Sequence, residues 1–168
     1  MIDALLRRTA LVFAMAGSLA ALLTALLVVT SVVGRAVFGA PINGDVELTQ
    51  FGIALGISLS LPWCQLRGAN ILVDFFTEKL AEKKLRRLDG VGALLLALMC
   101  ALLAWRTAMG ALAVHDAHET SMILALPMWW AYASLAPGLA LAAWVALVQA
   151  ARHLRGMPLH DLHGGEPE

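Results

Sequence analysis

Long runs of apolar residues, separated by short polar stretches, dominate this chain of 168 residues. A helix needs about 20 apolar residues to cross the roughly 30 Å hydrocarbon core of a bilayer. Four runs reach or approach that length, at residues 11–33, 46–63, 91–113 and 126–148. The first has no charge, the second opens with polar side chains, and the third is apolar except for Arg106, late in the run. The pattern predicts an all-α integral membrane protein whose four transmembrane helices form one domain over residues 1–155.

The connection between the second and third runs has a different pattern, with charged and apolar residues interleaved. At 100° per residue, Val73, Phe76 and Leu80 fall on one half of a helical wheel and Lys79 on the other. An imperfectly amphipathic helix over residues 70–88 is therefore predicted, lying in the membrane interface on the cytoplasmic side. Its basic anchors would be Lys83, Lys84, Arg86 and Arg87. The alternative is an ordinary loop helix without membrane contact.

The placement of basic residues predicts the orientation. Ten of the twelve Lys and Arg residues lie in the N-terminal segment, the central connection and the C-terminal segment. Only Arg35 and Arg106 lie elsewhere. Under the positive-inside rule both termini are cytoplasmic, and residues 156–168 form a flexible cytoplasmic tail. A cleaved signal peptide is the alternative for the first run, but its length and the spans that follow favour an uncleaved helix.

Composition and motifs exclude several function classes. With 60% hydrophobic and 14% charged residues and a mean hydropathy of +0.78, the chain is far from a soluble globular domain. The zero net charge gives no indication of nucleic-acid binding. No hydrolase, nucleotide or protease motif occurs, and the histidines lie at run ends or in the tail, where they could not hold a haem inside the bundle. We expect no catalytic residue, no cofactor and no metal site, and two free thiols at Cys64 and Cys100.

Small residues indicate where helices pack closely. Gly52, Gly56 and Ser60 recur every fourth residue, and such a stripe allows two helices to approach closely in lipid. We expect this stripe to contact a partner helix. Trp63, Trp129 and Trp130 lie at run ends, where indoles anchor a helix at the headgroup level or contact a partner.

Three short motifs resemble one family. They are Gly-Asp-Val-Glu-Leu at 44–48, Arg-Gly-Ala-Asn-Ile-Leu-Val-Asp at 67–74, and Thr-Ser-Met followed by Leu-Pro-Met-Trp-Trp-Ala-Tyr between 120 and 132. In this order, with four spans and a basic central connection, they resemble the small membrane subunit (Q or DctQ type) of tripartite ATP-independent periplasmic (TRAP) transporters. The resemblance extends from the first run to the fourth. The family often has His where this chain has Asn70, so an ionisable role at that position is in doubt.

The resemblance implies a multi-pass subunit of the bacterial inner membrane that forms a stable heterodimer with a larger membrane subunit. That subunit would import an organic acid with a sodium gradient, and a periplasmic substrate-binding protein would dock transiently. The small subunit would serve as a scaffold without a cofactor, in contact with the lipid bilayer and not with nucleic acid. Residues expected at the outward face toward the binding protein, or simply solvated, are Arg35, Asp45, Glu47, His118 and Glu119.

Three alternatives remain open from the sequence. One is the small four-span subunit of a tripartite tricarboxylate transporter, which has a similar size and topology. Another is a membrane anchor for a redox enzyme complex, and the third is a self-associating four-helix channel.

Overall fold

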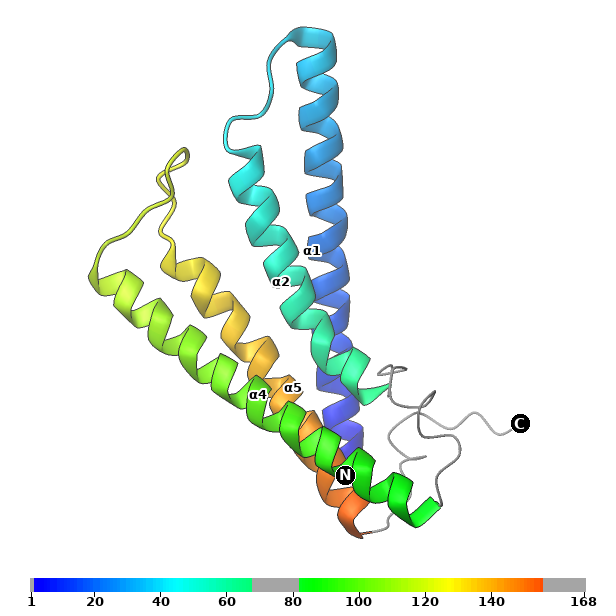
Figure 1. Cartoon of the computed structure of the whole chain (residues 1–168). Coiled ribbons are helices and arrows are strands. Elements are labelled where there is room, and N and C mark those ends of the chain that lie inside the picture. The colour runs from blue at the N-terminus through cyan, green and yellow to red at the C-terminus, as the bar shows by residue number, and fades with distance from the viewer. Residues whose placement is uncertain (1, 68–81, 156–168) are drawn as a thin grey trace.

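The structure, a computed structural model, describes residues 2–67 and 82–155. The helices in these ranges are α1 (Ile2–Phe38), α2 (Asp45–Leu66), α4 (Glu82–Asp116) and α5 (Trp129–Arg155). They form two helical hairpins, α1 with α2 and α4 with α5 (Figure 1). Both hairpin connections lie at one end of the molecule, which we call the connection end. The start of α1 and the end of α5 lie at the opposite, terminal end.

The helices pack in the order α1, α2, α5, α4. α2 contacts both α1 and α5, whereas α4 packs mainly against α5. Figure 1 shows the hairpins close together toward the terminal end and diverging toward the connection end. At the terminal end, the buried side chains of Leu6, Leu66 and Val145 form a small core, with Trp63 packed against it. α2 and α5 are therefore the central helices and α1 and α4 the outer ones.

Three of the described helices are long and apolar enough to cross a membrane. The candidate spans are Ala4–Phe38, Leu88–Asp116 and Trp129–Arg155. This confirms an all-α fold of membrane-protein type over the described residues. α2 is not among these candidate spans.

The helix bounds differ from the predicted ones at several points. α1 begins at Ile2, before the charged pair Arg7 and Arg8, because arginine favours helix even where it ends an apolar run. The predicted break between a helix at 70–88 and a span at 91–113 is wrong, since α4 runs unbroken from Glu82 to Asp116. Gly90 does not end this helix; it faces α5, where an added Cβ would lie 3.3 Å from the Cβ of His153. The rest of the predicted interfacial helix, residues 70–81, and the predicted tail at 156–168 lie outside the described residues.

The fourth span also begins later than predicted. Residues 126–128 are not helical: Ser121 N donates to the carbonyl of Leu126 (2.8 Å) and Met128 N to that of Glu119 (3.1 Å). These bonds close the connection between α4 and α5 around an isolated bridge between Thr120 and Pro127. α5 therefore starts at Trp129 and then continues past Val148 to Arg155.

α4 and α5 pack through a regular seam. On α4, buried or half-buried positions alternate at spacings of three and four residues, the pattern of a coiled coil. The seam positions are Gly90, Ala93, Ala97, Cys100, Ala104, Thr107, Ala111 and Val114. Most of these side chains are small, so the two helices lie close together and the opposite face of α4 points away from the molecule.

The two hairpins are joined by polar and glycine contacts between α2 and α5. Gln65 Nε2 donates to Gln149 Oε1 (2.8 Å), and Gln149 Nε2 donates back to the Gln65 carbonyl (2.8 Å). Nearer the connection end, Ser58 Oγ donates to the carbonyl of Leu135 (2.7 Å). Gly138 faces this point, where an added Cβ would overlap the backbone of Ser58. Glycine at 138 is thus required for the hydrogen bond and for the contact of the hairpins.

We predict that Gly138→Ala separates the hairpins and destabilises the fold by about 1–3 kcal/mol, the usual effect of overpacking. The measurement is SDS-induced unfolding of the purified chain in mild detergent, followed by circular dichroism. Gly92→Ala is the matched control, because a Cβ at Gly92 meets nothing within 4 Å. It should be neutral or stabilising by about 0.5–1 kcal/mol, as alanine favours helix. Equal unfolding curves for the two variants would contradict the close approach of α2 and α5.

Candidate functional site

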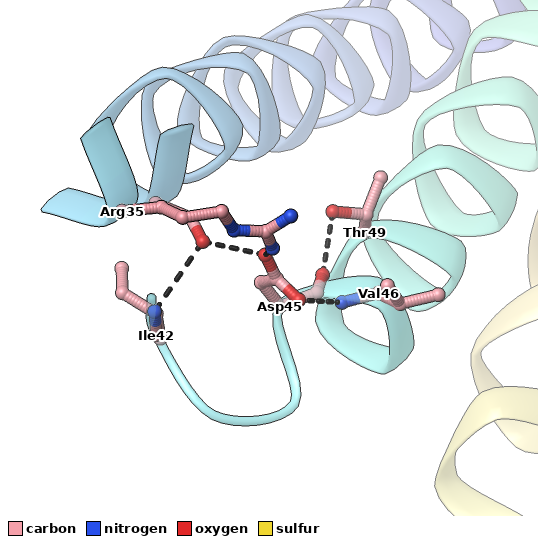
Figure 2. Close-up of polar contacts among 6 residues, drawn as sticks. Arg35, Ile42, Asp45, Val46 and Thr49 are labelled. Carbon is pink, nitrogen blue, oxygen red and sulfur yellow. Dashed lines mark hydrogen bonds and ion pairs between the residues drawn. The ribbon is translucent and has the colours of Figure 1, made fainter. Parts of the chain in front are cut away.

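Asp45 organises the connection between α1 and α2. Ser31 Oγ donates to Asp45 Oδ2 (2.5 Å), and the guanidinium of Arg35 lies 3.5 Å from the same oxygen (Figure 2). Ser31 Oγ in turn accepts the amide of Ile42 (3.3 Å), so the hydroxyl joins α1 to the connection. The other carboxylate oxygen accepts the amide of Val46 (2.8 Å). One carboxylate at the start of α2 therefore fixes the turn that follows α1.

The same contacts keep Asp45 ionised. The hydrogen bond from Ser31, followed by the Val46 amide and Arg35, lowers the pKa of Asp45 below its usual 3.8, although partial desolvation opposes them. Asp45 precedes the predicted span, so it titrates against water. Because the pKa of Asp45 is lowered by folding, its contribution to stability is complete at a pH above its usual pKa. That contribution is lost as the pH falls through the folded-state pKa. The turn is therefore charged and intact at neutral pH.

Glu47 connects the two hairpins at the connection end. Its Oε1 accepts the amide of Ile123 (2.9 Å) and its Oε2 the amide of Leu124 (3.2 Å). We call this contact the Glu47 latch. Next to it, Gly44 adopts a left-handed conformation (φ 74°) directly against the side chain of Leu124. The latch ties the α4–α5 connection to the first turn of α2, where Figure 1 shows that connection reaching toward α2.

The remaining predicted outward residues, His118 and Glu119, lie in the α4–α5 connection. Both are exposed, and the ring of His118 lies 6.3 Å from that of His115. Arg35, Asp45 and Glu47 thus have structural roles within the chain, which the sequence did not reveal. Contact of any of the five with a binding protein stays a prediction. Within residues 2–67 and 82–155 no cluster of three or more His, Cys, Asp or Glu side chains could hold a metal ion.

The stripe of Gly52, Gly56 and Ser60 faces α1 of the same chain. A Cβ on Gly17 of α1 would lie 2.6 Å from Ser60 Oγ and 2.9 Å from the Gly56 carbonyl. A Cβ on Gly52 would overlap Thr24. The predicted close helix contact is therefore made inside the chain. Its extension to a separate partner helix stays a prediction.

Beside this contact, an open apolar groove of about 620 Å³ runs between α1 and α2. Ala25, Val28, Ile53 and Ile57 line it, together with Gly56 and Ser60 of the stripe. The groove has no charged side chain in its lining, so it can accept an apolar helix or lipid chain but offers no chemistry for an ionic substrate.

The predicted tryptophan anchors lie at opposite ends of the molecule. Trp129 and Trp130 form the first turn of α5, with ring centroids 5.9 Å apart, and His115 packs edge-on against Trp129 at 5.5 Å. Trp63 lies at the terminal end, with the guanidinium of Arg67 5.0 Å from its ring. This placement fits two headgroup levels, while the lipid contact itself stays a prediction. Lys83, Lys84, Arg86 and Arg87 lie on the first turns of α4, but their side chains are outside the described part of the structure.

A match to a protein-family model identifies the family of this chain. Residues 24–156 match the family described as "Tripartite ATP-independent periplasmic transporters, DctQ component". This chain belongs to that family. The match covers most of the chain, including both sides of the Glu47 latch, and confirms the resemblance seen in the short motifs. Comparisons with curated proteins and with solved structures gave no match. DctQ proteins are subunits of transporters, not a family of enzymes.

We predict that Glu47→Ala releases the α4–α5 connection. Loss of the carboxylate leaves the amides of Ile123 and Leu124 without their acceptor, so their hydrogen exchange should accelerate roughly tenfold, the effect of losing about 1.4 kcal/mol of protection. Hydrogen–deuterium exchange with mass spectrometry of the peptide covering residues 120–126 measures this.

Glu119→Ala is the control for charge, because the Glu119 side chain is exposed in the same connection. In this variant, hydrogen exchange of the peptide covering residues 120–126 should match that of the wild type. Slow exchange at Ile123 and Leu124 in the Glu47 variant would show that the latch does not hold the connection.

Proposed function

We propose that this chain is the small permease subunit of a sodium-coupled TRAP transporter that imports an organic acid. Its role is to brace the large transport subunit in the membrane and to help seat the periplasmic substrate-binding protein. Membership in the DctQ family implies association with both components. The family match argues against the tricarboxylate-transporter and redox-anchor alternatives.

The observation that carries the scaffold role is the use of polar groups in the described bundle. Among the described residues, every buried side-chain nitrogen or oxygen has a hydrogen-bond partner. The polar side chains between the hairpins, such as Ser58 and the Gln65–Gln149 pair, bond to each other or to backbone. Secondary transporters place substrate and ion sites at polar groups or broken helices near the bilayer midplane. A bundle whose polar groups are already paired supports bracing and not translocation.

We further propose that all four helices cross the membrane. α2 has 22 residues and extends about 33 Å, enough for the hydrocarbon core. Two of the polar side chains that lower its apolarity, Ser58 and Gln65, are buried between helices and do not face lipid. With four crossings and the basic residues at the terminal end, both termini are cytoplasmic and the connection end is periplasmic.

The function is tested by purifying the tagged chain in mild detergent from its native host. We expect a stable complex with one large multi-span membrane protein. Reconstituted with it and the binding protein, the complex should take up organic acid only with an inward sodium gradient and without ATP. Recovery of the chain alone as a homo-oligomer, or with a soluble oxidoreductase, would refute the proposal.

The four-span topology is tested by labelling single cysteines with a membrane-impermeant maleimide, in a background where Cys64 and Cys100 are serine. Asn43→Cys and Asp116→Cys, both in exposed connection-end positions, should react in intact spheroplasts. Arg155→Cys, at the terminal end, should react only after the membrane is permeabilised. Labelling of Asn43→Cys and Asp116→Cys on opposite sides would mean that α2 does not cross.

A further inference from the structure

Arg106 lies on the face of α4 that points away from the rest of the chain. It is exposed, and so are the large apolar side chains around it. We call this surface the Arg106 face; it comprises Leu98, Met99, Leu102, Trp105, Arg106 and Met109. The α4 seam toward α5 lies on the opposite side of the helix. Arg106 is thus a single cation within an apolar surface.

The position of Arg106 along the bundle can be read from its neighbours. Gly110 lies against Tyr132, where an added Cβ would be 3.5 Å from Cδ1 of the ring. Because α4 and α5 are antiparallel, Arg106, one turn further from the connection, is level with Ala136. That level is seven residues, about 10 Å, inside Trp129, the first residue of α5. With Trp129 at the headgroup level, as predicted from the sequence, the backbone of Arg106 is placed within the hydrocarbon region.

The described chain offers Arg106 no counter-charge. Among the residues whose side chains the structure describes, 4–67 and 88–155, no ion pair or hydrogen bond involves its guanidinium. The end of α2, the start of α4 and the end of α5 all lie at the terminal end (Figure 1). Arg106 is 24 residues, about 36 Å, along α4 from Glu82. The compensating anion must therefore come from outside the described chain.

Two anions are available in a membrane: a lipid phosphate and a carboxylate of another protein. In a helix the Cα–Cβ bond tilts toward the N-terminus. For α4 this direction is the terminal end, so the Arg106 side chain starts toward the bilayer centre and away from the nearer headgroups. This geometry disfavours snorkelling to phosphate and favours an acceptor at the depth of the helix itself.

We propose that the Arg106 face is the docking surface for a transmembrane helix of the large subunit, and that this helix carries an Asp or Glu opposite Arg106. The proposal rests on the proposed function and assigns the contact to one face of one helix. Trp, Met and Arg are the side chains enriched at protein interfaces, and here they surround one another. The apolar side chains would exclude lipid headgroups and water from the ion pair. The ion pair would in turn set the register of the two helices.

The test compares Arg106→Leu with Arg106→Lys in the tagged chain expressed with its large subunit. Leucine suits a lipid-exposed helix, so the free variant should keep the wild-type circular dichroism spectrum and membrane yield. Recovery of the large subunit should fall roughly tenfold, as expected for loss of an interhelical polar contact in lipid. Arg106→Lys keeps the charge and should retain most of the recovery.

A photoreactive amino acid in place of Leu102 or Met109 should cross-link to a large-subunit segment that contains Asp or Glu. Arg106→Glu should weaken the complex, and exchanging that acid for Arg should restore it. Recovery of the large subunit with Arg106→Leu at the wild-type level, or cross-links to lipid alone, would overturn the inference. If the wild-type chain recovers no large subunit, the proposed function itself fails; if it does and Arg106→Leu does equally, only the Arg106 contact fails.

Discussion

The structure depends on the packing of α2 between α1, its partner in the first hairpin, and α5 of the second hairpin. α2 carries Ser58 and Gln65 in its middle and last turns and Glu47 in its first, so it could not face lipid on all sides without leaving polar groups unpaired. α5 supplies the partners for Ser58 and Gln65, and the α4–α5 connection supplies two amides to Glu47. Three of the polar residues that lower the hydropathy of α2, Glu47, Ser58 and Gln65, therefore also specify its neighbours.

Close approach on both sides of α2 follows from the same requirement. A hydrogen bond from the short hydroxyl of Ser58 to a backbone carbonyl demands that the helix axes lie near each other, and Gly138 permits it. On the other side Gly17 and Gly56 let α1 approach α2 closely as well. The hairpins are joined through the middle and terminal end of the bundle and again at the Glu47 latch. Because the two hairpins are in contact at both ends of the bundle, hinge motion between them is restricted. Such rigidity suits a component that braces a moving partner.

Hydropathy and charge predicted the helical membrane fold, but helix ends depended on contacts that hydropathy does not encode. The apolar run begins only after Asp89 and Gly90, yet α4 already includes both residues, and Gly90 packs on α5. The glycine stripe of α2 was visible in the sequence, whereas its partner was not, since a spacing of four identifies a face and not what meets it. Glu47 could be predicted to lie at the outer end but not to latch the hairpins, because its acceptor role involves backbone amides of Ile123 and Leu124 that have no sequence signature.

At its depth in the membrane, Arg106 is unfavourable in the free chain and becomes favourable only when a partner supplies a carboxylate. An arginine at the centre of a transmembrane helix opposes insertion by about 2.5–3.5 kcal/mol, and Arg106, between the centre and the level of Trp129, carries part of that penalty, whereas leucine at the same position favours insertion. No other described residue offsets this penalty, so Arg106 makes the isolated subunit less stable than its fold allows. Pairing with a carboxylate removes the penalty only when that carboxylate is at the right depth and on the right face. Replacing both members of such an ion pair by apolar side chains would change the net affinity little, whereas losing one member or misaligning the two leaves a charge unpaired in the membrane. The pair thereby selects a single register for a surface otherwise made of interchangeable apolar side chains.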